Sequence, residues 1–584
     1  MPFFRRHTPF ALGVGLLFVA GLARSQAPDP LSVVQPSLTG TRGPYEVAFT
    51  PDGKRALVTE WDEGAVAVIE TATGQVVQHV PTGSQPTGVA VSPDGQLALV
   101  TNSAGGSLSV VHLNTLRVET VPLRGFPFDV VITPDGATAC VSLSQLDQVV
   151  FLDLASRQVV ETVAVGRRPR TLALSQDGKV LAVANFQGGS VTFLSPQSRR
   201  VIGVGPTPAV NLKGVALFPN SARAYCIGQR AQNERATETP IGVWSNQSFI
   251  VRPGGGPNGD VNLWLDLMGK DVAEPDSVVF DPEGRRIFMT CGGGHSVNTH
   301  PAQGDGDTVT IRHVGAQPRG LSFTPDGKEL WVACQLSNDV AVIDPVRLTV
   351  SRRISLGPTQ RKDPHLLGRF LFNSATLTKG GQFSCNSCHP DGGTDGISWK
   401  FVHVPDGLGR ETPRNVRVLA GGLTDTAPFR WTGHDANLEE FVQTEVTKLL
   451  GGPELGAERV RAIADYIASL PAPPNPYRGA DGSLTGAAQR GKTLFSGKAD
   501  CIQCHTGPKS GGGRKANIGT TPAGVDLDVP HLTGVFDSDP YLHHGKAKSL
   551  EAIWEQYDPE KKHGKVQGLT PDEMRDLLAY VREL

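Results

Sequence analysis

The stretch 46–58 (EVAFTPDGKRALV) decides the fold, because it places an alternating apolar run on each side of a Pro-Asp-Gly turn. Period-two alternation bounded by turn residues predicts two β-strands joined by a tight hairpin, with the glycine at positive φ. The triplet occurs seven times, intact or degenerate, with its middle residue at positions 52, 94, 135, 177, 220, 283 and 326. The intervals are 41–43 residues except for one of 63, which indicates an internal repeat with an insertion in its fifth copy.

Each copy of the repeat holds four alternating apolar runs, of which the third in the first copy is 65–69 (AVAVI). Four strands per unit are typical of one propeller blade, and the blades need to close a ring because each buries its faces only against its neighbours. The runs 99–102 (LVTN) and 106–110 (GSLSV) resemble the bacterial YVTN-type propeller repeat. This resemblance implies an all-β, seven-bladed β-propeller over residues 43–357. The insertion, around residues 231–266, is a candidate contact loop, with a solvent-exposed loop of no function as the alternative.

Composition and the N-terminus narrow the class of protein. The 55 Lys+Arg and 57 Asp+Glu residues give a net charge of -2, and without a long basic run this excludes nucleic acid as a partner held by a basic field. Arg5 and Arg6 precede the apolar run 10–22, and small residues follow it. This pattern predicts a signal peptide over residues 1–25, and hence a periplasmic or secreted protein with no membrane span after cleavage. An uncleaved anchor is the alternative.

The C-terminal part carries two Cys-x-x-Cys-His motifs, 385–389 (CNSCH) and 501–505 (CIQCH). Two thiols on one turn can reach the two vinyl groups of a haem as thioethers, and the adjacent imidazole can then bind the iron. A zinc site or a redox dithiol would also use paired cysteines, but neither requires a histidine directly after both pairs. The motifs therefore predict two haems c, with these cysteines as covalent attachment points and these histidines as proximal iron ligands: Cys385, Cys388, His389, Cys501, Cys504 and His505.

Matched segments surround the two motifs. Upstream of each, a glycine suited to a helix crossing is followed one turn later by an aromatic residue, and downstream of each comes an amphipathic segment with a tyrosine. These segments are 368–372, 458–470 with Tyr466, 491–495, and 571–584 with Tyr580. The tyrosines are 114 residues apart and the motifs 116 apart. We therefore expect a multidomain chain in which two all-α cytochrome c lobes, 358–470 and 480–584, follow the propeller.

Three stretches around the motifs carry a resemblance to a known family. They are 491–508 (GKTLFSGKADCIQCHTGP), 540–551 (PYLHHGKAKSLE) and the counterpart of the latter, 428–439 (PFRWTGHDANLE). Over about residues 360–584 the chain resembles bacterial di-haem cytochromes of the cytochrome c peroxidase and methylamine-utilisation type. The resemblance implies a di-haem redox protein.

The resemblance leaves the sixth iron ligands open. In that family a Met or Tyr just before His-x-Gly binds the second iron, but here that place is Leu542, which cannot bind iron. Either the second iron is open, or His543 or His544 takes the position, and His543 is our candidate. The candidates for the first iron are His434, with His365 and His403 as alternatives.

The predicted function is electron transfer through the two haems. A peroxidase would also need an acid–base group at an open iron, and the Asn-Pro-x-Glu-Met stretch usual in the family is missing at 441–446 (FVQTEV). Glu445, Glu411 and Trp431 are the remaining candidates for catalytic residues, so a di-haem peroxidase or related oxidase is the first alternative. The second alternative is a propeller binding module whose haems sense redox state.

The propeller is expected to dock a partner, either a small redox protein or a quinone-linked electron donor or acceptor. The four cysteines outside the motifs lie in blades three, five, six and seven, where we expect buried free thiols rather than disulfides. They are Cys140, Cys226, Cys291 and Cys334.

Overall fold

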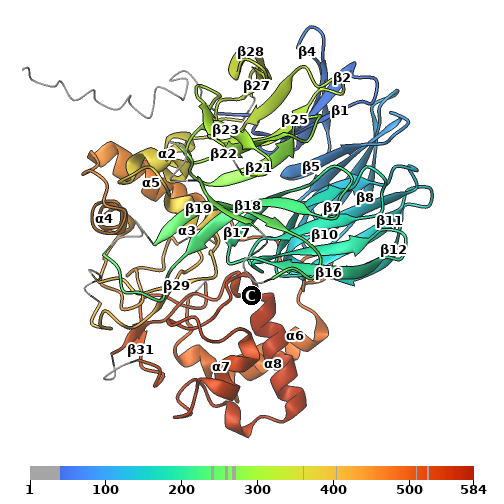
Figure 1. Cartoon of the computed structure of the whole chain (residues 1–584). Coiled ribbons are helices and arrows are strands. Elements are labelled where there is room, and N and C mark those ends of the chain that lie inside the picture. Colours follow the sequence, from blue (N-terminus) through green and yellow to red (C-terminus); the bar gives the residue numbers. More distant parts are fainter. Residues whose placement is uncertain are drawn as a thin grey trace, which may run out of the picture.

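The computed structural model describes residues 40–584 apart from 239–242, 257, 258, 260, 266–270, 305, 360, 403, 405, 422, 508 and 522–524. The predicted signal peptide therefore lies outside the described residues. A ring of sheets forms the first part of the chain (Figure 1). A first helical group, containing α2 (Leu366–Asn373) and α5 (Ala457–Ser469), lies beside the ring, and a second, containing α6 (Gly486–Ser496) and α8 (Pro571–Glu583), lies below it in the view of Figure 1.

The propeller consists of seven antiparallel four-stranded sheets, each continuous in sequence, so the prediction of a seven-bladed propeller is confirmed. Blades one to four contain β1 (Pro44–Phe49), β2 (Arg55–Glu60), β3 (Ala65–Glu70), β4 (Gln75–Pro81); β5 (Pro86–Val91), β6 (Leu97–Asn102), β7 (Ser107–His112), β8 (Arg117–Pro122); β9 (Pro127–Ile132), β10 (Thr138–Leu143), β11 (Gln148–Asp153), β12 (Gln158–Ala164); and β13 (Pro169–Leu174), β14 (Leu181–Asn185), β15 (Ser190–Ser195), β16 (Arg200–Pro206). Blades five to seven contain β17 (Val210–Leu217), β18 (Ala224–Ala231), β19 (Trp244–Val251), β20 (Val261–Trp264); β21 (Pro275–Phe280), β22 (Arg286–Cys291), β23 (Ser296–Pro301), β24 (Val309–Ile311); and β25 (Pro318–Phe323), β26 (Leu330–Cys334), β27 (Asp339–Asp344), β28 (Thr349–Ser355).

The Pro-Asp-Gly turns form the hairpins between the first two strands of the blades and also link neighbouring blades. In the first blade, Oγ1 of Thr50 donates a 2.7 Å hydrogen bond to Asp52, and Gly53 has a φ of 68°. Gly53 also lies against Pro325, the turn proline of the seventh blade, and the same contact recurs between other neighbouring blades. The row of turns therefore closes on itself, and the inner strands β1 and β25 pack together at the same junction, as ring closure requires.

The helical part contains two groups of elements, each with one Cys-x-x-Cys-His motif. The first group adds to α2 and α5 the elements α3 (Cys385–Cys388), α4 (Leu438–Thr444), and the helical turns η3 (Ala375–Leu377), η4 (Pro390–Gly392) and η5 (Glu445–Leu449). The second adds to α6 and α8 the elements α7 (Leu550–Gln556), η6 (Cys501–Gln503), η8 (Val535–Asp537) and η9 (Val566–Gly568). The expectation of purely helical lobes is wrong in one respect, because each group also holds a short antiparallel ladder: β29 (Ser398–Trp399) with β30 (Arg414–Asn415), and β31 (Lys515–Ala516) with β32 (Leu527–Asp528).

The same helix crossing stabilises both groups. A Cβ added to Gly368 of α2 would lie 1.9 Å from the carbonyl oxygen of Ala462 in α5. A Cβ added to Gly491 of α6 would lie 1.9 Å from the carbonyl oxygen of Asp576 in α8. Such a distance is far inside van der Waals contact, so each crossing requires a residue without a side chain.

The expected aromatic pairs follow each crossing by one turn. The rings of Phe372 and Tyr466 have centroids 5.3 Å apart in an edge-on arrangement, and those of Phe495 and Tyr580 are also 5.3 Å apart and edge-on. Edge-on pairs of this kind stabilise a core beyond the area that they bury. The two groups therefore repeat one packing unit, as the spacing of the tyrosines predicts.

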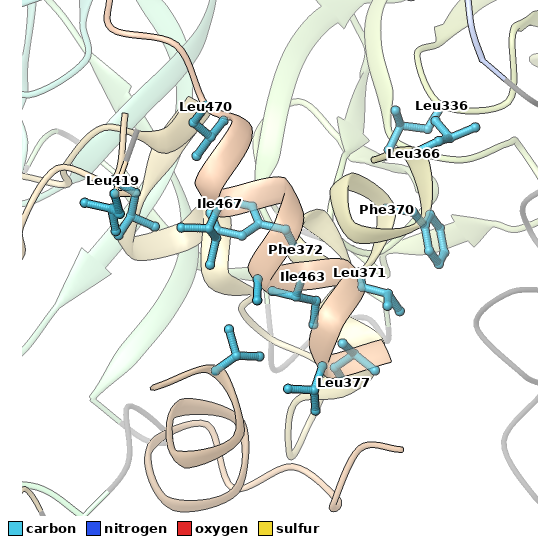
Figure 2. Close-up of a cluster of buried hydrophobic side chains, with 14 of the residues drawn as sticks. Leu336, Leu366, Phe370, Leu371, Phe372, Leu377, Leu419, Ile463, Ile467 and Leu470 are labelled. Atoms are coloured by element: carbon cyan, nitrogen blue, oxygen red, sulfur yellow. The ribbon is translucent and has the colours of Figure 1, made fainter. Parts of the chain in front are cut away.

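The core of the first helical group includes side chains from the propeller. Figure 2 shows Leu371 and Phe372 of α2 gathered around Ile463 and Ile467 of α5. Leu336, from the loop between β26 and β27, belongs to the same buried cluster. The propeller and this group consequently share apolar contacts and are not joined by a linker alone.

The contacts between the propeller and the helical groups lie on one face of the propeller. In five blades the residue just before the inner-strand proline has a φ of 50–59°, and we call these residues the docking ring: Gln85, Phe126, Arg168, Glu274 and Gln317. The amide of Gln317 donates a 2.7 Å hydrogen bond to Asn373 of α2, and Arg168 lies 2.7 Å from the carboxylate of Asp537 in the second group. Equivalent positions of different blades therefore hold both helical groups.

The four cysteines of the blades are buried and form no disulfide, as expected. Burial raises the pKa of the Cys140 thiol to about 12, so that thiol stays protonated at neutral pH. In the part of the chain that the structure describes, no helix combines the length and the apolar character needed to cross a membrane.

Candidate functional site

Two apolar pockets each contain one Cys-x-x-Cys-His motif. The first pocket contains the motif 385–389 and the second contains 501, 504 and 505. Their walls are mostly aromatic and aliphatic, including Trp399, Phe429, Phe441 and Ile463 in the first and Phe495, Leu532, Trp554 and Leu577 in the second. Walls of this kind, with few polar groups, suit a large apolar ligand that is to be kept from water.

The motif histidines have the orientation that metal ligands need. Nδ1 of His389 lies 3.4 Å from the carbonyl oxygen of Gly393, and Nδ1 of His505 lies 3.1 Å from that of Ser510. A ring N–H that is held by a backbone carbonyl fixes the tautomer and leaves Nε2 to bind a metal. Burial lowers the pKa of His389 to about 4, which keeps the imidazole neutral. With the paired thiols and the apolar walls, these residues fit a covalently attached haem in each pocket.

The two motifs differ in exposure. Asn386 and Ser387 of the first are 2% and 1% exposed, and Asn211 of the propeller donates a 2.8 Å hydrogen bond to the carbonyl of Ser387. Ile502 of the second motif is 46% exposed, and Cys504 is also exposed. The first motif is therefore covered by the propeller, whereas the second lies at the protein surface.

The wall of the first pocket carries an arginine–glutamate ion pair. Nη1 of Arg430 lies 2.5 Å from Oε1 of Glu445, and Nε of Arg430 also pairs with Asp435. Arg430 and Glu445 both line the pocket. Among the described residues that line it, His389 is the one histidine and there is no methionine. This pocket thus contains one strong candidate iron ligand, His389, together with the acid–base pair Arg430 and Glu445.

The other candidates for the first pocket lie elsewhere. His434 and His365 do not line it, and His403 falls outside the described residues. Nε2 of His434 instead lies 3.9 Å from the carboxylate of Asp435. Glu411 has a side chain that is 68% exposed and lines neither pocket. Of the three candidates for catalytic residues, Glu445 and Trp431 are the ones that line the first pocket.

The second pocket contains more histidines than its motif supplies. His543 lines it and is 1% exposed, whereas His544 does not line it. Burial lowers the pKa of His543 to about 4, so its imidazole is neutral and able to bind a metal. His531 and His563 also line this pocket. Sequence reasoning missed both, because neither belongs to the motif loops that the family resemblance points to.

A common wall separates the two pockets. Residues 415–418 and Trp431 line both of them. Nε1 of Trp431 donates a 2.9 Å hydrogen bond to the carbonyl of Asn415, and the guanidinium of Arg417 lies 5.1 Å from the centroid of the Trp431 ring. The ring centroid of His543 is 6.3 Å from that of Trp431. One fixed indole therefore lies between the two candidate haem sites.

A smaller hollow adjoins the first pocket and shares Arg430 and Glu445 with it. Glu238, from the segment inserted into blade five, lines the hollow together with Lys448. The neighbouring Thr237 pairs with Phe401, a residue of the first pocket wall. The insertion thus contacts the first helical group beside the acid–base pair, and its Glu238 lines a hollow that Arg430 and Glu445 also line.

Arg430 was missed although the sequence contained a signal for it. When 428–439 is aligned with 540–551, Arg430 falls at the position of Leu542, the place of the family's sixth ligand. The backbone agrees with this alignment, because the two residues have φ values of 72° and 68°. An arginine at that position predicts a polar group, rather than an iron ligand, on the wall of the first pocket.

Comparisons with known proteins agree with the haem assignment. Residues 488–584 match the family model of cytochrome c, which implies haem c. The chain is 27% identical to the hydrazine synthase subunit gamma of Kuenenia stuttgartiensis over 37% of this chain and 76% of that protein. It is 28% identical to the methylamine utilization protein MauG of Methylorubrum extorquens over 37% of this chain and 77% of that one. It is 26% identical to a cytochrome c551 peroxidase of Nitrosomonas europaea, over 37% and 78% respectively. The relatives are of the di-haem cytochrome c peroxidase and MauG type.

Proposed function

We propose that this chain is an exported di-haem c-type oxidoreductase, periplasmic or secreted, that moves electrons between a redox partner at its surface and a small substrate in the first pocket. The observation that carries the proposal is the difference between the pockets. The first adds Arg430 and Glu445 to its motif histidine, and the second adds His543. One site is thus suited to chemistry at an open iron and the other to electron transfer.

The proposal treats residues 358–470 and 480–584 as two cytochrome c lobes. Cys385 and Cys388 would hold one haem and Cys501 and Cys504 the other, with the motif histidines as proximal ligands. When bound, each haem supplies an iron centre that gains and loses one electron. The matched helix crossings and the matched histidine orientations of the two groups support two haems rather than one.

Glu445 and Arg430 would handle protons and charge in the first pocket. A carboxylate on the wall of a closed pocket can accept a proton from a small substrate and return it to a departing oxygen. Arg430, held by both Glu445 and Asp435, fixes the direction of that carboxylate and can stabilise negative charge that develops nearby. Hydrogen peroxide is a substrate of suitable size, and the names of two relatives support this choice.

The surface of the second motif is the best supported docking site for the partner. Segment 490–516 has six basic residues and one acidic residue, and Arg514 donates a hydrogen bond to the carbonyl of Gln503 inside the motif. An exposed apolar residue, Ile502, in a segment rich in basic residues suits a small redox protein with an acidic surface. A quinone-linked donor or acceptor remains the second choice, and its docking on the propeller is less well supported because one propeller face already holds the helical groups.

The test is an EPR spectrum of the oxidised holoprotein combined with peroxide turnover. We expect two haems per chain, one high-spin and one low-spin, and steady consumption of hydrogen peroxide with a reduced cytochrome as donor. Two low-spin signals without turnover would leave electron transfer as the function and remove the peroxidase. Two haems that can be reduced and reoxidised, but that neither exchange electrons with a small cytochrome nor consume peroxide, would favour the alternative of a propeller module with redox-sensing haems.

A further inference from the structure

A buried carboxylate of the propeller is bonded to the first Cys-x-x-Cys-His motif. Glu274, in the loop before β21, is 2% exposed. Its Oε1 accepts a 2.9 Å hydrogen bond from Ser387 and another from Ser384, and its Oε2 accepts a 2.8 Å hydrogen bond from the amide of Asn386. Two of these three donors are the residues between the motif cysteines. One propeller side chain therefore contacts the turn on which both thiols lie.

The two hydroxyls of the motif turn each use their single donor on Glu274. Oγ of Ser384 accepts a 3.0 Å hydrogen bond from the backbone N–H of Asn386, while Oγ of Ser387 accepts a 2.9 Å hydrogen bond from the backbone N–H of Ser384. Each hydroxyl thus accepts from the backbone and donates to Glu274. Because a carboxylate only accepts, it fixes the direction of both hydroxyls in this reciprocal cap.

The network continues past the motif to two arginines of the propeller. Oδ1 of Asn386 accepts a 2.9 Å hydrogen bond from the N–H of Asp391, which fixes the orientation of the Asn386 amide. The carboxylate of Asp391 lies 3.0 Å from Arg170 and 3.5 Å from Arg319. The segment that begins with the first cysteine and passes the proximal histidine is held at both ends by buried propeller charges.

Among the described residues, the second motif has no such support from the propeller. Its intervening residues Ile502 and Gln503 are exposed, and the carboxylate that precedes it, Asp500, pairs with Lys565 of the same helical group. Glu274 also stands apart within the docking ring, whose other members are glutamine, phenylalanine and arginine. Of the five residues of the docking ring, the acidic one is thus the one whose side chain contacts a Cys-x-x-Cys-His turn.

We propose that Glu274 is a positioning residue for the first haem, so that the propeller is a structural part of that haem site and not only a module attached to it. This inference rests on the proposed function, because it requires a haem at Cys385 and Cys388. The buried carboxylate holds the two thiols and the proximal histidine in one geometry. Its negative charge also lowers the reduction potential of the first haem, because it favours the oxidised, more positive iron.

The test compares full-length holoprotein with Glu274→Gln and Glu274→Ala, and uses Gln85→Ala as the matched control. Gln85 occupies the same ring position in blade two, with a φ of 52° against 53° for Glu274. Haem count is measured by pyridine haemochrome and intact mass, haem location by peptide mapping, and both midpoint potentials by spectroelectrochemical titration. Circular dichroism melting verifies that the propeller is folded.

We expect Glu274→Gln to keep two haems while the midpoint of the first alone rises. We expect Glu274→Ala to yield a fraction of chains that lack one haem, with the loss confined to Cys385 and Cys388, and Gln85→Ala to match the parent. If both Glu274 variants carry two haems with unchanged midpoints, the inference is overturned and the proposed function stands. If the parent itself carries no haem at Cys385 and Cys388, the proposed function fails and takes this inference with it.

Discussion

Trp431 donates a 2.9 Å hydrogen bond from its indole nitrogen to the carbonyl of Asn415, and both residues line both pockets. The hydrogen bond and the guanidinium of Arg417 over the ring hold the indole in one orientation between the two candidate haems. A fixed aromatic ring at that place can shorten the gaps that an electron has to cross.

Replacing Trp431 should therefore slow electron exchange between the haems. We expect Trp431→Leu to retain both haems while the second haem, once reduced, passes its electron to the first more slowly than in the parent. Stopped-flow absorbance of the half-reduced protein measures that rate. Trp399→Phe is the control, since Trp399 lines the first pocket alone. Equal rates in the Trp431 variant and the parent would exclude Trp431 from the path.

The helix crossings allow a matched stability test. Gly368→Ala and Gly491→Ala each place a methyl group 1.9 Å from a carbonyl oxygen of the partner helix. Each should reduce the free energy of unfolding of its helical group by about 1–3 kcal/mol, as overpacking of a close contact does. Gly568→Ala, which meets nothing within 4 Å, should change little. Thermal unfolding followed at the haem absorbance measures the effect, and equal melting of all three variants would contradict the crossing argument.

The two glutamate candidates give a direct test of catalysis. Glu445 lies on the first pocket wall beside Arg430, whereas Glu411 is exposed. If Glu445 is the acid–base group, Glu445→Gln should lower kcat for peroxide by roughly 10²- to 10⁴-fold, and Glu411→Gln should have no effect. Haem spectra of both variants serve as the check on folding. A Glu445→Gln protein with parental kcat would assign the proton transfer to another group.

The propeller was predictable from sequence because its determinants are local. The turn around Asp52 and Gly53 is closed by bonds between Thr50, Asp52 and Arg55, and the same hydroxyl–aspartate bond recurs in five of the seven blades. The helix crossings were predictable for a related reason, since Gly368 and Gly491 each precede a phenylalanine by four residues. In both cases the repetition within one chain separates a structural pattern from chance.

The union of propeller and haem motif was not predictable from sequence. Glu274 precedes Ser384 by 110 residues, and nothing in its own repeat distinguishes it from an ordinary loop acid. Its contact depends on how the helical group lies on the ring, which is a property of the tertiary structure. Arg430 is a different case, because the alignment of 428–439 with 540–551 puts it at the position of Leu542, a signal that the sequence contained and our prediction did not use.

The histidine candidates for sixth ligands differ in position, and the difference predicts their spectra. His543 lines the second pocket and is buried, whereas His434 lines neither pocket. We expect His543→Ala to convert the low-spin EPR signal to high-spin and His434→Ala to leave both signals unchanged. If His543→Ala keeps a low-spin haem, His531 or His563, which line the same pocket, becomes the ligand to test.

Glu46, on the inner strand β1 of the first blade, should make the free energy of unfolding depend on pH. Burial, together with the nearby carboxylates of Asp129 in β9 and Asp276 in β21, raises the pKa of Glu46 in β1 from its ordinary 4.5 to about 8. Between pH 4.5 and about 8, Glu46 is therefore protonated in the folded protein and ionised in the unfolded chain. The stability due to this proton is fully present below pH 4.5 and is lost as the pH rises through about 8.

Glu46→Gln removes this dependence because the amide is neutral at every pH and keeps an oxygen to accept the 3.0 Å hydrogen bond from the N–H of Val47. The variant should melt at the parental temperature near pH 4.5 and above it near pH 8.5. The difference at high pH should be on the order of 1 kcal/mol, since the Glu46 residue is partly exposed and water screens part of the effect. Glu283→Gln, in an exposed turn of blade six, should follow the parent throughout. If the parent and Glu46→Gln show the same pH dependence of melting, Glu46 is ionised in the folded propeller at neutral pH. Burial and the carboxylates of Asp129 and Asp276 then do not raise its pKa.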